Sequence, residues 1–265
     1  MKCRRTTRVT DPTFMGSGMV TEQDGPRIRL DMRAQLVARR QLLDAGAAPI
    51  GWKIGFGAPA AMAKLGIAAP LVGYMTDRSL VASGAAVSLF GWAKPLAETE
   101  IAVHMGRDLA GDAGPSEAVS AIAALGPAIE LADLDRPPED PQTILSGNIY
   151  HRHVILGPRD TARAGARLDE WSGRVARNGA ETARVSDLEA NTGNILDLVL
   201  HVAATLSAFG ELLRGGDVVI CGAVVPPIEL RPDDKEIAFR LEPGGRICSV
   251  RFEQGALRAT RRNAG

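Results

Sequence analysis

The segment 97–105 alternates in a way that a β-strand explains. Successive side chains of a strand point to opposite faces, so Ile101 and Val103 share one face. Glu98 and Glu100 share the other face. Two carboxylates that point the same way into a domain repel each other, and removing them from water is costly. The pair therefore indicates either a solvent-exposed strand face or a site where a cation lies between the carboxylates.

A third glutamate favours the cation site. Glu130 lies among apolar neighbours in a separate predicted strand, 128–132. Three carboxylates from two strands suit Mg²⁺ or Mn²⁺, hard cations that keep several waters and also bind substrate oxygens. We therefore predict a Mg²⁺ or Mn²⁺ site at Glu98, Glu100 and Glu130.

The rest of the sequence indicates many short strands and few helices. Helices are predicted over 30–46, 58–65, 115–125 and 193–213, and further strands over 50–54, 86–90, 153–156, 218–221, 236–241 and 247–252. Thr192 is the predicted cap of the last helix, Asn178-Gly179 predicts a hairpin over 171–185, and Pro70 with Gly73 predicts a loop over 70–80. Strands and helices do not alternate regularly, so the predicted fold class is α+β rather than a doubly wound sheet.

The first 27 residues are polar and lack periodicity, which predicts a disordered N-terminal arm before a single catalytic domain over 28–265. Met15 and Met19 offer alternative start positions within this arm. Aromatic residues make up only 4 % of the chain, so the core must be built from Ala, Val, Leu and Ile.

Charge and composition exclude several classes of protein. The 31 basic and 31 acidic residues balance, without the basic excess typical of nucleic-acid binding, so no nucleic-acid partner is expected. No apolar run reaches the roughly 18 residues of a membrane span, and no apolar segment follows the basic N-terminus as in a secretory signal. Cys3, Cys221 and Cys248 lack metal-type spacing, which indicates reduced thiols in a cytoplasmic protein.

Four motifs occur in the order and spacing of the fumarylacetoacetate hydrolase superfamily. They are Gly-Trp-Lys-Ile-Gly (51–55), Glu-Thr-Glu-Ile-Ala (98–102), Ala-Ile-Glu-Leu-Ala-Asp (128–133) and Gly-Asp-Val-Val-Ile-Cys-Gly (216–222). Over about residues 30–253 the chain most resembles the branch of 2-keto-4-pentenoate hydratases and 4-oxalocrotonate decarboxylases. This resemblance implies a mixed β-sandwich or roll wrapped by helices, assembled as a homo-oligomer.

The resemblance also implies a site and a reaction. Glu98, Glu100 and Glu130 match the metal-binding carboxylates of the family, and Lys53 matches its motif lysine, which makes Lys53 the candidate catalytic residue. The implied substrate is a 2-oxo or 2-hydroxydienoic acid that chelates the metal through its carboxylate and C2 oxygens. Lys53 would neutralise the substrate carboxylate or carry protons, and water would add at C4.

Two positions depart from the family pattern. Leu71 stands where the hydratases carry an acidic residue, and Gly147-Asn148-Ile149-Tyr150 replaces an Asp-Asn-Ala-Ser stretch. The candidate substrate-binding residues are Leu71, Asp77 and Asn148, with Asp77 as a replacement for the missing carboxylate. Three functions therefore stay open: a hydratase, a decarboxylase or C–C hydrolase of a related oxo acid, and a catalytically impaired oligomer that binds an oxo acid.

The histidines add little at this stage. His104 shares the face of Glu98, and a structural role or a role in supporting the metal ligands is favoured for it over metal ligation itself. For His151 and His153 we favour surface positions over positions at the site. His201 is predicted to lie in the core of a buried helix.

Overall fold

The fold is described by a computed structural model for residues 25–137 and 140–253. The helices are α1 (Gly25–Asp44), α2 (Pro59–Leu65), α3 (Pro115–Ala121), α4 (Pro141–Ser146) and α5 (Ile195–Ala208), with short 3₁₀ turns η2 (Asp77–Ser79), η3 (Asn148–Tyr150) and η4 (Thr161–Arg163). The strands are β1 (Pro49–Gly55), β2 (Leu71–Thr76), β3 (Leu80–Val81), β4 (Ala86–Val87), β5 (Pro95–Met105), β6 (Ile122–Asp133), β7 (His151–Leu156), β8 (Ser172–Arg177), β9 (Ala180–Val185), β10 (Val218–Ala223), β11 (Ile228–Glu229), β12 (Glu236–Glu242) and β13 (Arg246–Phe252). This composition confirms the predicted α+β class.

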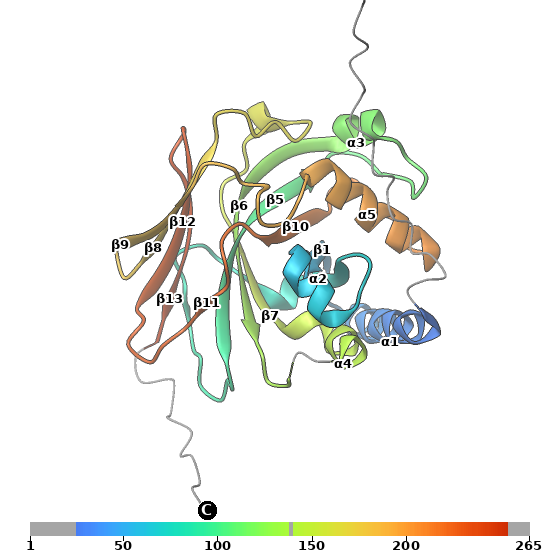
Figure 1. Ribbon diagram of the computed structural model, residues 1–265, viewed down its shortest axis with the longest axis horizontal. Helices are drawn as coiled ribbons and strands as arrows, with labels where there is room; N and C mark the ends of the chain where they lie inside the picture. Colours follow the sequence, from blue (N-terminus) through green and yellow to red (C-terminus); the bar gives the residue numbers. More distant parts are fainter. Residues whose placement is uncertain (1–24, 138–139, 254–265) are drawn as a thin grey trace, which may run out of the picture.

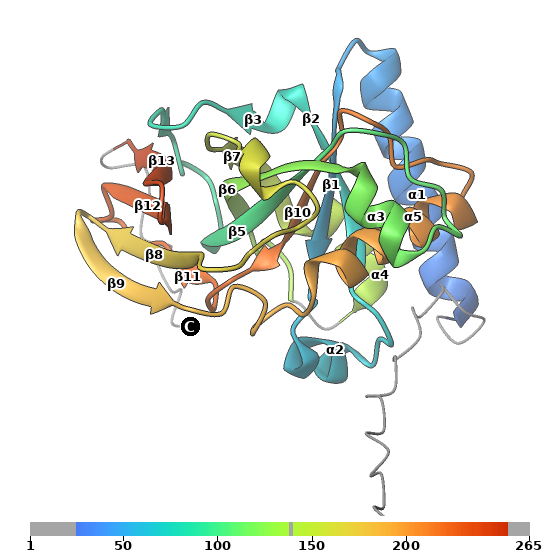
Figure 2. The ribbon, with the colours of Figure 1, turned by 90° about the horizontal axis from the view of Figure 1, so that it is seen from above.

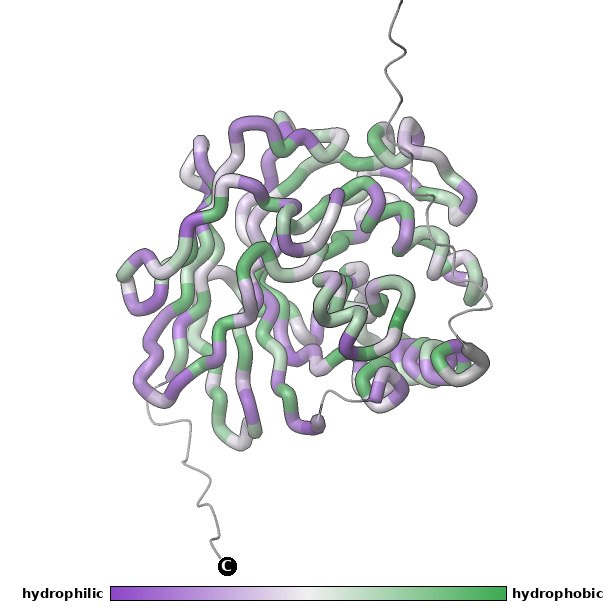
Figure 3. Tube along the Cα trace, viewed as in Figure 1, coloured by the Kyte–Doolittle hydropathy of each residue, from purple (hydrophilic) through white to green (hydrophobic). Residues whose placement is uncertain are grey.

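The strands form two sheets. The larger one has the order β2-β1-β10-β5-β6-β7-β3, with β11 paired to β5, and the smaller one has the order β4-β13-β12-β8-β9. The smaller sheet and the helices α1 and α5 lie on opposite sides of the larger sheet (Figures 1 and 2). One apolar cluster of mostly aliphatic side chains continues through both sheets. The hydropathy colouring shows that the central strands are apolar, whereas the tip of the β8–β9 hairpin is polar (Figure 3).

The long central pair of β5 and β6 was only partly predicted. The predicted helix 115–125 ends at Ala121, and Ile122 already belongs to β6, where it pairs with Met105 of β5. Gly126 is not a helix stop. It lies in the middle of β6, where an added Cβ would come within 3.1 Å of the Pro158 carbonyl oxygen, so a glycine is needed for close packing.

The predicted loop over 70–80 is wrong. Residues 71–76 form β2, a fully buried strand that pairs with β1 and sets Gly73 opposite Lys53. A Cβ on Gly73 would lie 2.9 Å from Lys53 Cγ and 2.8 Å from Asn148 Oδ1. The glycine therefore makes room for two neighbouring side chains and does not mark a turn.

The boundaries of two helices also differ from the prediction. Asn194, not Thr192, caps α5, because its side chain accepts hydrogen bonds from the N–H groups of Leu196 and Asp197. Helix α1 begins at Gly25, inside the arm predicted for 1–27, and residues 1–24 with Cys3 lie outside the described part of the chain. The Asn178-Gly179 hairpin is confirmed, with both turn residues at positive φ. Among the described residues, no helix is long and apolar enough to cross a membrane.

Candidate metal and catalytic site

Three glutamates meet at one point between the two long strands. Glu98 and Glu100 lie on one face of β5, and Glu98 is paired directly with Glu130 of β6. One carboxylate oxygen from each of the three lies within 4.8 Å of the other two. Glu100 and Glu130 are fully buried, whereas Glu98 is partly exposed. The alternation of the β5 sequence predicted that Glu98 and Glu100 share a face, and the pairing of β5 with β6 adds Glu130 to them.

The hydrogen bonding around these carboxylates fits a cation. Glu100 Oε2 accepts the N–H of Gly222 at 2.6 Å, and Glu130 Oε1 is engaged by two side-chain donors. Their other oxygens, Glu100 Oε1 and Glu130 Oε2, are buried and have no hydrogen-bond partner among the described residues. A buried polar atom without a partner costs about 1–3 kcal/mol, and more when it is charged. Hard oxygen ligands of this kind suit Mg²⁺, Mn²⁺ or Ca²⁺, which would satisfy both atoms.

The pKa values of the three carboxyl groups are shifted in different directions. Burial, together with the neighbouring Glu130, raises the pKa of Glu98 to about 7 and raises the pKa of Glu100 well above its ordinary range. For Glu130 burial acts in the same direction, but Lys53 and His151 overcome it and lower the pKa of that carboxyl. A divalent cation at this cluster would favour the ionised carboxylates and so oppose the effect of burial on Glu98 and Glu100.

Lys53 lies beside this cluster. It belongs to β1, which runs between β2 and β10, and only 1 % of the residue is exposed. Its Nζ forms an ion pair with Glu130 Oε1 and donates to the carbonyl oxygen of Ile149 at 3.1 Å. The motif lysine is thus in direct contact with Glu130, one of the three carboxylates of the cluster.

The segment before β7 has an unusual backbone. Asn148, Ile149 and Tyr150 have φ values of 52°, 54° and 61°, three left-handed residues in succession without a glycine. Each such residue costs about 1–2 kcal/mol, and strain of this kind gathers at functional sites. This turn presents the Ile149 carbonyl to Lys53, and the next residue, His151, places its Nδ1 2.7 Å from Glu130 Oε1. The surface position favoured for His151 is therefore wrong.

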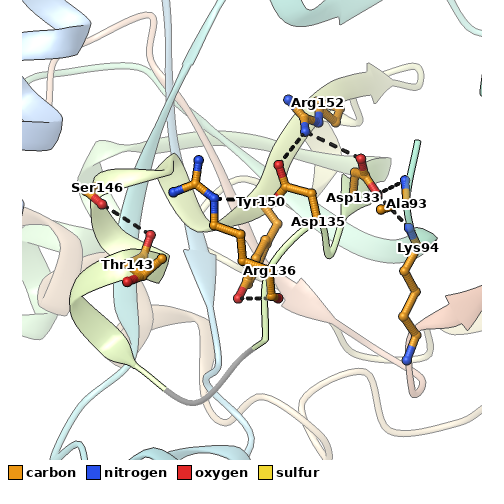
Figure 4. A network of polar contacts seen from close by, with 9 residues as sticks. All are labelled: Ala93, Lys94, Asp133, Asp135, Arg136, Thr143, Ser146, Tyr150 and Arg152. Atoms are coloured by element: carbon orange, nitrogen blue, oxygen red, sulfur yellow. Dashed lines mark hydrogen bonds and ion pairs between the residues drawn. The ribbon is translucent and has the colours of Figure 1, made fainter. Parts of the chain in front are cut away.

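A cavity of about 220 Å³ opens beside Lys53 and Glu98. Its other lining residues are largely apolar or backbone: Ile54, Gly55, Phe56, Gly57, Ala58, Ala61, Leu96, Ala132, Leu134, Ile149, Tyr150, Asn191, Thr192, Gly222, Ala223 and Pro227. The hydroxyl of Tyr150 is occupied elsewhere, since it donates to the Arg136 carbonyl at 3.2 Å (Figure 4). Within the described part of the chain, Lys53 is the only basic residue on this cavity wall.

The candidate substrate-binding residues lie away from this cavity. Leu71 is buried in β2, and Asp77 accepts the Ala48 N–H at 2.9 Å. The Asn148 amide is held at both ends by the backbone of Tyr74, with two bonds of 2.9 Å. None of the three lines the cavity, so Asp77 does not replace the missing carboxylate there.

The other histidines serve the surrounding fold. His104 is partly buried, and burial lowers its pKa to about 4. His153 stacks on Trp92, and His201, half-buried rather than in the core, contacts the Pro70 carbonyl through Nε2 at 2.8 Å. His151 and the Ile149 carbonyl were missed at the site because a left-handed turn of non-glycine residues has no sequence signature. Thr192, which lines the cavity, was predicted only as a helix cap.

Comparison with known proteins identifies the family and the fold. Residues 56–260 match the family described as Fumarylacetoacetate (FAA) hydrolase C-terminal. A 2-hydroxyhexa-2,4-dienoate hydratase of Comamonas testosteroni is 28 % identical over 94 % of this chain and 93 % of its own length. A 4-oxalocrotonate decarboxylase of a Pseudomonas species is 26 % identical over 83 % of this chain and 84 % of its own. The solved 4-oxalocrotonate decarboxylase of Pseudomonas putida G7, complexed with magnesium and adipate, has the same fold, with a TM-score of 0.77 at 24 % identity over 85 % of this chain and 86 % of that one.

Proposed function

Because the chain belongs to the fumarylacetoacetate hydrolase family, we propose that it is a divalent-metal-dependent hydratase of a 2-hydroxy-2,4-dienoate, with a 4-hydroxy-2-oxo acid as product. The observation that carries this proposal is the buried cluster of Glu98, Glu100 and Glu130 in contact with Lys53, with two carboxylate oxygens that lack a donor. We further propose that it acts on this small molecule as a cytoplasmic homo-oligomer.

The three glutamates would hold Mg²⁺ or Mn²⁺. When bound, the cation supplies a Lewis acid to the carboxylate and C2 oxygens of the substrate. The magnesium complex of the Pseudomonas putida decarboxylase supports a divalent cation in this fold. Glu98 forms part of the cavity wall, so the chelating end of the substrate would lie against this side of the cavity.

Lys53 would carry the proton. Ketonisation moves a proton from the 2-hydroxyl group to C5 and leaves a conjugated 2-oxo-3-enoate. Water then adds its hydroxyl group to C4 and a proton to C3. Lys53 is the titratable cation on the cavity wall, and the Ile149 carbonyl and Glu130 hold its Nζ at the metal side of the cavity. An amine in this position can both give and accept a proton, which is the task of a general acid–base catalyst.

The cavity wall favours hydration over the decarboxylation of a dioate. A 2-oxo-enedioate has a second carboxylate at its far end, and burying that charge without a partner is costly. Phe56, Leu96 and Leu134 offer no such partner, and Lys53 is the only basic residue among the described residues that line the cavity. The substrate tail should therefore be neutral and short, since this cavity is smaller than the roughly 300–1,000 Å³ of drug-sized sites.

The test compares 2-hydroxypenta-2,4-dienoate and 2-hydroxyhexa-2,4-dienoate with a 2-oxo-enedioate, each with Mg²⁺ and again with EDTA. Loss of dienol absorbance that requires Mg²⁺, with a 4-hydroxy-2-oxo acid as the NMR product, supports the proposal. Release of CO₂ from the enedioate as the main reaction supports a decarboxylase instead. Thermal stabilisation by 2-oxo acids without turnover of any substrate supports an oxo-acid-binding protein.

A further inference from the structure

We propose that His151 is a positioning residue, which holds Glu130 in its metal-binding orientation while Lys53 engages the substrate. This inference rests on the proposed function, because it assigns a role at the same metal site. It concerns a residue that the family motifs of this chain do not include.

Both donors of Glu130 contact one of its two oxygens. Lys53 Nζ and His151 Nδ1 both contact Oε1, and the distance from His151 Nδ1 is 2.7 Å. Among the described residues, no donor contacts Oε2. A carboxylate with both donors on one oxygen has its rotation fixed, and its second oxygen is left for a cation. Ligand carboxylates are commonly oriented by outer hydrogen bonds of this kind.

Lys53 cannot serve both tasks throughout a reaction. Among the described residues that line the cavity, Lys53 is also the only basic one, so its Nζ is the group that can bind an anionic substrate. When Nζ turns to the substrate, His151 is the only other described side chain that donates to Glu130. Because a carboxylate oxygen accepts hydrogen bonds, we assign the donor role in this contact to His151 Nδ1. The histidine thus keeps Glu130 in place independently of the lysine.

The backbone of this segment is shaped to deliver that contact. His151 follows the three left-handed residues 148–150, and it faces Ala132 at the point where the register between β6 and β7 shifts. Such irregularities in a strand pair re-aim a side chain near active sites. The turn is anchored from both ends, by the Asn148 amide on the Tyr74 backbone and by the Tyr150 hydroxyl on the Arg136 carbonyl (Figure 4).

Four variants of the full chain separate this role from general packing. His151→Phe keeps a ring without a donor, His151→Asn keeps a donor at the position of Nδ1, and His151→Gln moves the donor outward. The matched control is His153→Phe, two residues along the same strand, whose ring stacks on Trp92 with centroids 5.9 Å apart.

The readout is the affinity for Mn²⁺ without substrate, measured by the loss of the free Mn²⁺ EPR signal, together with kcat and KM on a 2-hydroxydienoate. Loss of an outer-shell partner commonly weakens metal binding about 10–100-fold. We expect a weakening of this size for His151→Phe and His151→Gln at an unchanged circular dichroism spectrum. His151→Asn and His153→Phe should remain within about threefold of the parent, which is below the 10–100-fold loss expected for the other two variants.

Three results would overturn the inference: His151→Phe binds Mn²⁺ like the parent, His151→Asn binds as weakly as His151→Phe, or the parent itself binds no Mn²⁺. If His151→Phe does not fold, His151→Gln decides in its place. If the parent binds Mn²⁺ and the variants rank as expected but no dienoate is turned over, the positioning role stands and the proposed reaction falls.

Discussion

Replacing Lys53 by methionine tests whether the buried ion pair is the main support of Glu130. Lys53 and Glu130 are both almost completely buried, and the variant leaves the carboxylate with the His151 donor alone. Removing one partner of a buried ion pair lowers the free energy of unfolding by about 3–5 kcal/mol. Because His151 still donates to Glu130, we expect the lower end of this range, about 3 kcal/mol. In a chain of this size each kcal/mol lowers Tm by roughly 2–4 °C, so Tm should fall by about 6–12 °C in EDTA.

Two comparisons make this prediction specific. Lys94→Met removes a half-exposed lysine whose ion pair with Glu229 spans 3.9 Å at the surface. Exposed pairs contribute about 1 kcal/mol or less, so this control should lower Tm by less than about 4 °C. Saturating Mg²⁺ should narrow the gap between Lys53→Met and the parent, because a bound cation neutralises Glu130 in place of the lysine. Equal Tm values for the two variants in EDTA, by differential scanning calorimetry, would refute the reasoning.

Further outcomes can be stated from the same contacts. Lys53→Arg should fold but lose at least about a hundredfold in kcat, because arginine cannot release its proton; normal turnover in a steady-state assay contradicts the proton-carrier role. Since burial raises the pKa of Glu98 to about 7 and that of Glu100 above its ordinary range, both carboxyls must lose protons before a cation binds. Mg²⁺ affinity should therefore rise between pH 6 and 8, by up to about tenfold per pH unit for each proton released, and calorimetry that finds no pH dependence argues against protonated ligands. Gly73→Ala places a Cβ 2.9 Å from Lys53 Cγ and should cost about 1–3 kcal/mol in denaturant unfolding. Leu134→Arg should raise kcat/KM for a 2-oxo-enedioate relative to a neutral-tailed dienoate; an unchanged ratio would mean that the tail does not lie against this wall.

The convergence of Glu98, Glu100 and Glu130 could be predicted because most of the information is local. A strand alternates strictly, so the sequence around Glu98 and Glu100 already states that both point to one face. Glu130 needed only a second strand beside the first, and the pairing of β5 with β6 sets it directly opposite Glu98. The β8–β9 hairpin could likewise be predicted from its turn at Asn178-Gly179.

The sequence-based predictions fail where the role of a residue depends on a contact with a residue that is distant in the sequence. Gly73 suggested a loop, yet its small size is required by Lys53, which lies across the strand pair. Thr192 suggested a helix cap, yet Gly193 has a φ of 93° and lies outside the helix, and the cap of α5 is Asn194. In both cases the local structural propensity is overridden by the folded context, which a short stretch of sequence does not reveal.

His151 is the clearest instance, and it bears on how the chain manages without the acidic residue at position 71. The position is occupied by Leu71, buried inside β2, so no carboxylate approaches the cavity from that strand. The site instead receives its extra polar groups from the other side, where the strained turn 148–150 brings the Ile149 carbonyl to Lys53 and the His151 ring to Glu130. Strain in three consecutive residues persists only where the surrounding contacts sustain it. The buried Lys53–Glu130 pair therefore receives two hydrogen bonds from residues 149 and 151, at the junction of η3 and β7, and not from β2.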